Sequence, residues 1–247
     1  IDYDRVNLGG SAQYYVSFDN EDVGRLQAQA MMDCFAADGV TNPKIIMIDG
    51  GTDVDNNAVL FKAGAHSVFD PLVAQHKLTI VQEVVDKGWD VNNVAGVFQP
   101  ALTSAGNKID GVYAANDDIA NAVIGVLKQS GLNGHVVITG QDSGVEGLQN
   151  ILNGQQSLTI FKKVQLEADA ASQLAVALIS NKTPASVGIT LTKFNDPKAA
   201  SHNIQALLLP VEVITQANVE DVVKAGALTA AKICQGIQSV CSKFGVK

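Results

Sequence analysis

Short apolar runs alternate with amphipathic segments along most of this chain, and that alternation limits the folds open to it. The runs lack the polar alternation of half-exposed strands, and they cover residues 14–18, 44–48, 78–84, 109–115, 135–140 and 157–161. Segments with helical periodicity lie between them, one starting near residue 20 and others over about 56–73, 117–131, 145–152 and 166–180. Strands buried on both faces and joined by crossover helices form a parallel sheet. The chain is therefore predicted to have an α/β fold.

The alternation stops near residue 184. Loop residues and one expected strand fill the segment 184–204, and an apolar run follows over 205–214. Within that run Pro210 removes a backbone donor, which favours an edge strand or a crossing between lobes. A helical tail is expected from Val219 onward. At 247 residues, 47% of them hydrophobic, the chain can form two lobes or one large α/β unit.

The formal net charge of −8 argues against a nucleic-acid or anionic-membrane surface. The densest basic feature is only a pair, Lys162 with Lys163. No apolar stretch approaches the roughly 18 residues needed to cross a bilayer, and no signal peptide is visible. Because the chain starts with Ile1 in place of Met, we expect an upstream segment to have been removed.

The three cysteines do not form a CxxC pair, which argues against a zinc or redox motif. Cys34 has helical spacing in an apolar segment and is expected in the core. Cys234 and Cys241 would lie about 10 Å apart on a straight helix, whereas a disulfide needs Cα atoms within about 7 Å. They can pair only if the helix breaks between them, which Gly236 would permit. A disulfide there would indicate an oxidising compartment.

Three of the expected strands end in acids or amides, in the sequences KIIMIDGGTDVDNN, DGVYAANDD and VVITGQDSG. Ligands bind outside the carboxyl ends of open parallel sheets, so this coincidence predicts a ligand site. Asp53, Asp55 and Asn57 have the spacing of a calcium loop, but Ala58 and Gly64 stand where that loop needs glycine and glutamate. A phosphate loop is excluded as well, because its glycine motifs are absent and the acidic side chains would repel the anion.

A neutral polyol suits these residues better than an ion. Hydroxyl groups both donate and accept hydrogen bonds, so fixed carboxylates, amides and cationic groups can satisfy them. Trp89, the only tryptophan, follows a strand and can offer its ring to an apolar sugar face. Each residue also has an ordinary structural interpretation, since Asn57, Asn116 and Asp142 can cap helices and Trp89 can lie in the core. The pattern alone leaves both interpretations open.

Six segments of the chain together resemble a known protein family. They are YDRVNLGGSAQYYVSFDNEDVGRLQAQAM, GGTDVDNNAVLFKAG, KGWD, AANDDIANAVIGVLKQSGL, ITGQDSGVEGLQNI and LTIFKKV. In content and order they resemble the type I periplasmic sugar-binding proteins of ABC importers, and the xylose-binding branch in particular. The resemblance implies two doubly wound parallel-sheet lobes joined by three crossings, with a sugar in the cleft between them. Hinges would then lie at 18–20, at 141–143 and near 203.

The resemblance also implies which residues bind the sugar. Trp89 would stack on the sugar ring, while hydroxyl groups would be bound by Arg5, Asp55, Asn57, Lys62, Asn116, Asp142 and Lys162. Two positions depart from the xylose-binding branch. Lys62 stands where the branch usually has arginine, and Lys163 replaces the proline after Lys162. A point charge in place of a planar fork at Lys62 leaves the identity of the sugar open.

A further departure is a missing segment. Family members carry about a hundred residues before the YDR motif, which is close to the size of a small domain. The resemblance implies a C-terminal lobe made of 19–141 and 204–247, and a remnant of the N-terminal lobe made of 1–18 and 142–203. Such a remnant would expose the apolar sides of 14–18 and 157–161 to water. We therefore expect a separate chain to supply the segment, or a second copy to cover the gap.

The implied function is that of a solute-binding component of an ABC sugar importer, with no enzymatic activity. It would be extracytoplasmic, either periplasmic or lipid-anchored at the cell surface, and would close over a monosaccharide and present it to a membrane permease. Xylose is the first expectation, then a related aldopentose or hexose. The alternative is the sugar-sensing effector domain of a LacI-type transcription regulator, which would need a helix-turn-helix. A third hypothesis, an enzyme using Asp55 and Asp142 as acid and base, lacks a nucleophile or metal set. No cofactor, metal or nucleic-acid partner is expected.

Overall fold

The computed structural model describes residues 1–198 and 203–247. The chain forms two compact units, a smaller one of Ile1–Asp19 with Lys162–Val211 and a larger one of Asn20–Phe161 with Glu212–Lys247. The chain therefore passes between units after Asp19, Phe161 and Val211, where hinges were expected at 18–20, at 141–143 and near 203. The first position agrees, and the other two lie later in the sequence.

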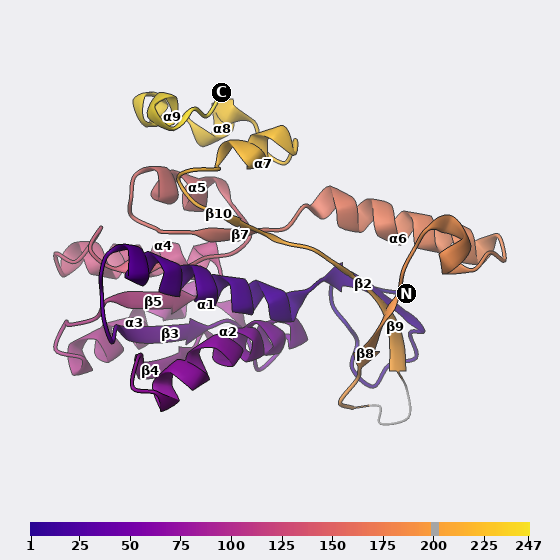
Figure 1. Ribbon diagram of the computed structural model, residues 1–247, viewed down its shortest axis with the longest axis horizontal. Coiled ribbons are helices and arrows are strands. Elements are labelled where there is room, and N and C mark those ends of the chain that lie inside the picture. Colours follow the sequence, from indigo (N-terminus) through magenta and orange to yellow (C-terminus); the bar gives the residue numbers. More distant parts are fainter. Residues whose placement is uncertain (199–202) are drawn as a thin grey trace. The chain divides into compact units, whose positions relative to one another are not determined.

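The larger unit is built on a parallel sheet with the order β4-β3-β5-β6 (Figure 1). Its strands are β3 (Lys44–Asp49), β4 (Thr79–Val85), β5 (Gly111–Ala114) and β6 (Val137–Ile138). Every neighbouring pair is parallel. From Ile45 to the end of β3, and throughout β5, the residues are buried, as uninterrupted apolar runs predict.

Helices cover both faces of this sheet. α1 (Asn20–Ala37) packs against α2 (Asn56–Ala74), and α3 (Val94–Ser104) packs against α4 (Asp117–Gln129), with the two pairs on opposite faces (Figure 1). Two glycines allow α1 and α2 to approach closely. A Cβ atom on Gly24 would lie 1.8 Å from the Phe61 carbonyl oxygen, and one on Gly64 would lie 1.9 Å from that of Glu21. The doubly wound α/β arrangement predicted from the sequence is thus confirmed.

The segment 142–161 lies in the larger unit, whereas the sequence assigned it to the remnant lobe. It forms α5 (Val145–Leu152) and β7 (Thr159–Phe161), and β7 pairs antiparallel with β10 (Glu212–Ile214). Three short helices follow β10, namely α7 (Glu220–Lys224), α8 (Ala230–Ile233) and α9 (Gln238–Phe244). Leu148, Ile151 and Phe161 form a second core with residues from these helices. The expected exposure of 157–161 is therefore wrong, because the C-terminal helices cover that strand.

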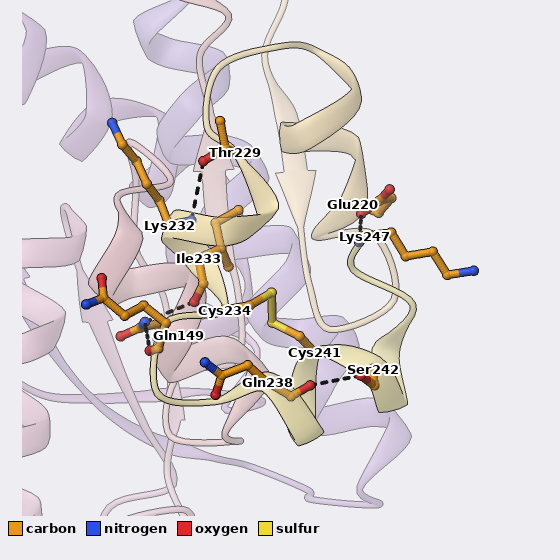
Figure 2. The surroundings of a disulfide bond; sticks show 11 residues. Gln149, Glu220, Thr229, Lys232, Ile233, Cys234, Gln238, Cys241, Ser242 and Lys247 are labelled. Carbon is orange, nitrogen blue, oxygen red and sulfur yellow. Dashed lines mark hydrogen bonds between the residues drawn. A yellow bond between two sulfur atoms is a disulfide. The ribbon is translucent and has the colours of Figure 1, made fainter.

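A disulfide joins Cys234 to Cys241, with the two Cα atoms 5.8 Å apart (Figure 2). The helical tail is broken between them, since α8 ends at Ile233 and Gly236 adopts a φ of 81°. Gln149 Nε2 in α5 donates hydrogen bonds to the carbonyl oxygens of Ile233 at 2.9 Å and Gln235 at 3.1 Å. The break that the cysteine spacing required is thus present.

The smaller unit holds a sheet with the order β1-β2-β9-β8. Its strands are β1 (Asp2–Tyr3), β2 (Tyr14–Phe18), β9 (Asn203–Leu209) and β8 (Thr192–Asn195), and only β8 runs antiparallel to its neighbour. α6 (Val164–Ile179) packs on β2 and β9, and η3 (Pro184–Val187) follows it. The expected exposure of 14–18 is also wrong, because α6 and the neighbouring strands bury Val16.

The most exposed large apolar side chains of the smaller unit lie on α6. Val164, Val176 and Ile179 are 61%, 64% and 83% exposed. In the described parts of the chain, no helix combines the length and the apolar character needed to cross a membrane.

Candidate functional site

Polar side chains of the larger unit follow the carboxyl ends of the four parallel strands. Asp55 and Asn57 follow β3, Trp89 follows β4, Asn116 follows β5 and Asp142 follows β6. Because parallel strands end at the same edge of their sheet, these loops share that edge. Five of the eight residues implied by the family resemblance are therefore brought to one side of one sheet.

Asp55 organises the first part of this edge. It is 6% exposed and caps α2, accepting a hydrogen bond from the Asn57 backbone N–H on Oδ1 at 2.9 Å. Its Oδ2 accepts from the Trp89 indole Nε1 at 3.1 Å. A carboxylate has about four lone-pair positions, so capping a helix does not by itself prevent it from binding a hydroxyl group. The capping role and a ligand-binding role are therefore compatible here.

The Trp89 ring packs against the backbone of two glycines. A Cβ on Gly50 would lie 1.9 Å from Trp89 Cη2, and a Cβ on Gly51 would lie 2.7 Å from Trp89 Cδ1. The residue ends the short helix η1 (Lys87–Trp89) with a φ of 58°, and the Gly88 N–H donates to Asp53 Oδ1 at 3.0 Å. The glycine backbone and the Asp55 bond together fix a half-buried aromatic ring beside a carboxylate. Asp53 accepts a backbone hydrogen bond from the turn that carries Trp89 and so stabilises that turn.

Lys62 is placed against other carboxylates. Its Nζ lies 2.9 Å from Asp49 Oδ2 at the end of β3 and also contacts Glu83 Oε1 of β4. Burial raises the pKa of Asp49 to about 6, although Lys62 opposes that shift. Burial disfavours ionisation of Glu83 too, but hydrogen bonds from Lys62, Asp49 and His66 lower its pKa overall. His66 Nε2 lies 3.3 Å from Glu83 Oε1 and extends this chain of charges along α2. The ammonium group of Lys62 is thus already engaged by two acids.

Asn116 and Asp142 occupy the next two loops. Asn116 caps α4 by accepting from the Ile119 N–H at 2.9 Å, and its Nδ2 makes no hydrogen bond with the described residues. Asp142 is exposed, has a φ of 95°, and its N–H donates to the Ile160 carbonyl at 2.9 Å. An amide donor and an exposed carboxylate therefore follow β5 and β6.

Two buried polar residues near this edge were missed by the sequence reasoning. Gln27 of α1 donates from Nε2 to the carbonyls of Ala114 and Gly140, both at 3.0 Å, and accepts from the Tyr113 hydroxyl. It ties the ends of β5 and β6 together, but nothing in a helical pattern marks a core glutamine. Asp117, the acid after Asn116, is 4% exposed and binds the loop after β6. The doubled acid in AANDD was its only signal.

Arg5 and Lys162 both belong to the smaller unit. Arg5 Nη1 donates to Asp4 Oδ2 at 2.7 Å. Burial and the charge of Asp4 raise the pKa of Glu167, on α6, to about 7, while Lys162, Tyr3 and Arg5 oppose the shift. The two predicted cationic residues thus act on one buried carboxyl that the sequence reasoning did not single out.

Among residues 1–198 and 203–247, no three histidine, cysteine or acidic side chains gather in a way that could hold a metal ion.

Residues 1–183 match the family model described as a periplasmic binding protein domain. The chain belongs to this family. The chain is 38% identical over 182 residues to the D-xylose-binding periplasmic protein of Escherichia coli K12, covering 74% of this chain and 53% of that protein. It is 30% identical over 239 residues to the multiple sugar-binding periplasmic receptor ChvE of Rhizobium radiobacter, covering 92% and 66%.

Among solved structures, the carbohydrate transporter solute binding protein of Chloroflexus aurantiacus, in complex with D-glucose, matches this chain with a TM-score of 0.80. It is 26% identical, and the match covers 94% of this chain and 73% of that one. The resemblance to type I periplasmic sugar-binding proteins, near the xylose-binding branch, is thus confirmed. The chain spans about half the length of the D-xylose-binding protein it matches.

Proposed function

We propose that this chain is the solute-binding component of an ABC sugar importer, binding a monosaccharide without transforming it. The observation that carries the proposal is the arrangement of Asp55 and Trp89. A buried carboxylate and a fixed aromatic ring are joined at 3.1 Å, at the ligand-binding end of a parallel sheet. This pairing of an acceptor with an apolar surface suits a sugar, which has hydroxyl groups around its edge and C–H groups on its faces.

The other residues of this edge supply complementary groups. Asn116 offers an amide donor, and Asp142 offers a carboxylate, a group that accepts hydroxyl protons well. We propose that Arg5 and Lys162 of the smaller unit donate to further sugar oxygens, and that Lys62 acts mainly by neutralising Asp49 and Glu83. We propose that the two units correspond to the two lobes of the family, with hinge motion at the unit boundaries after Asp19, Phe161 and Val211.

D-Xylose is the first candidate ligand, because a relative named for that sugar is 38% identical. Related aldopentoses and hexoses are the next candidates, since the Chloroflexus relative holds D-glucose. Discrimination would come from buried polar groups left unpaired by a sugar that lacks a hydroxyl, at about 1 to 3 kcal/mol for each lost partner.

Calorimetric titration of the full-length protein with D-xylose, L-arabinose, D-glucose and D-allose tests the proposal. We expect at least one sugar to bind, and we expect Asp142→Asn to weaken that binding. Asp33→Asn is the matched control, because it removes an exposed acid of the same unit, on α1 and away from the loops of this edge. Absence of binding heat with every sugar would refute a monosaccharide-binding function.

We propose an extracytoplasmic location and a membrane permease as the partner of the sugar-loaded form. The Cys234–Cys241 disulfide supports an oxidising compartment and counts against an intracellular transcription regulator. The residues upstream of this sequence distinguish a periplasmic protein from a lipid-anchored one. A helix-turn-helix upstream would favour the regulator instead.

We also propose that the smaller unit requires a complement. Val164, Val176 and Ile179 present a mostly exposed apolar surface on α6, and the relatives are longer than this chain. The complement is an N-terminal segment, supplied as a separate chain, or a second copy. Light scattering after size-exclusion chromatography of this chain alone should show self-association, and adding the relatives' N-terminal segment should reverse it. A stable monomer that binds no hydrophobic dye would contradict this proposal.

A further inference from the structure

The loop that carries Asp142 has a strained backbone. Asp142 and Ser143 follow one another with φ values of 95° and 54°, in the left-handed region that side chains other than glycine rarely occupy. Such residues persist only where the surroundings hold them in place, and they gather at functional sites. Something in the structure must therefore fix the turn formed by residues 141–144.

Asp117 contacts this turn on both sides of Asp142. On one side, the backbone N–H of Asp117 donates to the carbonyl of Gln141 at 3.0 Å. On the other side, the Asp117 Oδ2 accepts from the N–H of Gly144 at 2.9 Å. One residue at the start of α4 thus binds the backbone immediately before and shortly after the strained pair.

A hydroxyl relay adds a third attachment. The Thr159 hydroxyl accepts from the Ser143 N–H at 3.2 Å, and its interaction with the Asp117 carboxylate lowers the pKa of that acid against the effect of burial. Gln156 Nε2 donates to the other Asp117 oxygen, Oδ1, at 2.8 Å. The carboxylate therefore accepts from the Gly144 N–H and from Gln156, in a site where Asp117, Gln156 and Thr159 are all buried.

Two glycines leave room for this carboxylate. A Cβ on Gly140 would lie 2.2 Å from Asp117 Oδ1, and a Cβ on Gly147 would lie 2.4 Å from Oδ2. The backbone of the β6 end and the first turns of α5 can approach the acid only because neither residue has a side chain. The site is thus shaped around an acid at position 117.

We propose that Asp117 is the positioning residue for Asp142, holding the turn 141–144 in the conformation in which Asp142 binds the sugar. This inference rests on the proposed monosaccharide-binding function. It also explains why a carboxylate is buried among neutral donors. A carboxylate can accept from the Gly144 N–H and from Gln156 at once, whereas an asparagine turns an NH₂ group toward one of them.

The first test is D-xylose titration of Asp117→Asn and of the control Asp118→Asn. Asp118 is an exposed acid in the same first turn of α4, so its loss changes the helix-end charge equally. We expect Asp117→Asn to weaken binding at least about tenfold and Asp118→Asn to leave binding within about twofold. If the wild type binds D-xylose and Asp117→Asn binds equally well, the positioning role is overturned.

A rescue distinguishes positioning from a general loss of folding. In the double variant Asp117→Asn with Gln156→Glu, the new carboxylate at position 156 accepts from the amide introduced at position 117. The oxygen of that amide can then accept from the Gly144 N–H. We expect most of the lost affinity to return, although the Leu158 carbonyl loses its donor from Gln156. Failure of the double variant to recover affinity while it folds normally would count against the proposed geometry.

A double-mutant cycle tests whether Asp117 acts through Asp142. In the background of Asp142→Asn, we expect Asp117→Asn to weaken D-xylose binding by less than about twofold further. An equal tenfold loss in both backgrounds would overturn the inference. If Asp117→Asn does not fold, Thr159→Val removes only the hydroxyl relay, and the same cycle applies.

Hydrogen exchange at the Gly144 amide separates this inference from the proposed function. We expect Asp117→Asn to speed that exchange at least about tenfold, whatever the ligand turns out to be. If the wild type binds no sugar, the proposed function fails while the anchoring of the turn is still measured. Unchanged exchange at Gly144 in a folded Asp117→Asn protein would overturn the anchoring itself.

Discussion

Replacing Gly50 with alanine should displace Trp89 from the sheet edge. The new Cβ would lie 1.9 Å from Trp89 Cη2 and 2.2 Å from Cζ3. Carbon atoms pack at about 3.5 Å or more, so the ring must move by roughly 1.5 Å. A shift of that size stretches the 3.1 Å bond from Trp89 Nε1 to Asp55 beyond hydrogen-bonding range. Overpacking and the loss of a bond to a charged group together predict a decrease of about 2 to 4 kcal/mol in the free energy of unfolding.

The assay is direct because Trp89 is the only tryptophan in the chain. We expect Gly50→Ala to shift the fluorescence emission to longer wavelength, to lower the urea midpoint and to weaken D-xylose binding at least about tenfold. Gly125→Ala is the matched control. Gly125 is exposed in α4 with no atom near the position of a Cβ, so alanine there should stabilise the protein by about 0.5 to 1 kcal/mol.

The result that would refute this reasoning is a Gly50→Ala protein with the emission maximum and urea midpoint of the wild type. It would mean that Trp89 does not rest on the Gly50 backbone in solution. If both properties change but D-xylose still binds as tightly, the packing is right and Trp89 is not a sugar-binding surface.

Three further predictions concern other parts of the molecule. Burial raises the pKa of Asp49 to about 6 and of Asp117 to about 7, from an ordinary value of 3.8, so the folded state binds protons more tightly than the unfolded state. The free energy of unfolding should therefore fall as the pH rises from about 5 to about 7.5, by up to about 1.4 kcal/mol per pH unit for each group. A urea midpoint that rises over this pH range would contradict the prediction. Cys241→Ser should lower the free energy of unfolding by about 2 to 3 kcal/mol, measured by urea unfolding without reductant, and the wild type should show one reactive thiol when denatured and three after reduction. Asn116→Ser keeps a good helix cap but removes the amide donor, so it should weaken D-xylose binding without changing the urea midpoint, whereas equal binding would assign Asn116 to capping alone.

Much of the larger unit could be predicted from the sequence, because its central strands β3 and β5 are buried and most of its helices have regular periodicity. The expected run 44–48 lies within β3, and the expected helix 145–152 coincides with α5. α3 was missed, because Pro100 lies inside it and its sequence is apolar on nearly every side. A helical tail was expected from Val219 onward, with Gly236 as the residue that would permit a break. Gly226 and Gly236 both adopt positive φ values, and the tail is divided into three helices.

The candidate site could be predicted from the sequence only where polar residues directly follow strands. Acids and amides after strands mark loops at the sheet edge, and Asp55 and Asn116 indeed lie there. The partners of Lys62 were not predictable, because Glu83 is distant in sequence and lies in a strand identified by its apolar neighbours. The assignment of 142–161 also depended on pairing between β7 and β10, which are separated by most of the smaller unit's sequence. Contacts between remote segments leave no local pattern.

In the structure, helix capping and ligand binding are compatible roles for the loop residues. Helix capping and ligand binding were alternatives for each side chain taken alone, yet a cap consumes one acceptor position on one oxygen. Asp55 caps α2 with Oδ1 and holds Trp89 with Oδ2, while Asn116 caps α4 with its oxygen and keeps its amide nitrogen outside that bond. A cap fixes the side-chain torsions in advance, so less conformational entropy is lost when a ligand is bound. Residues that cap helices at this sheet edge are therefore better placed to bind a sugar than unconstrained residues of the same type would be.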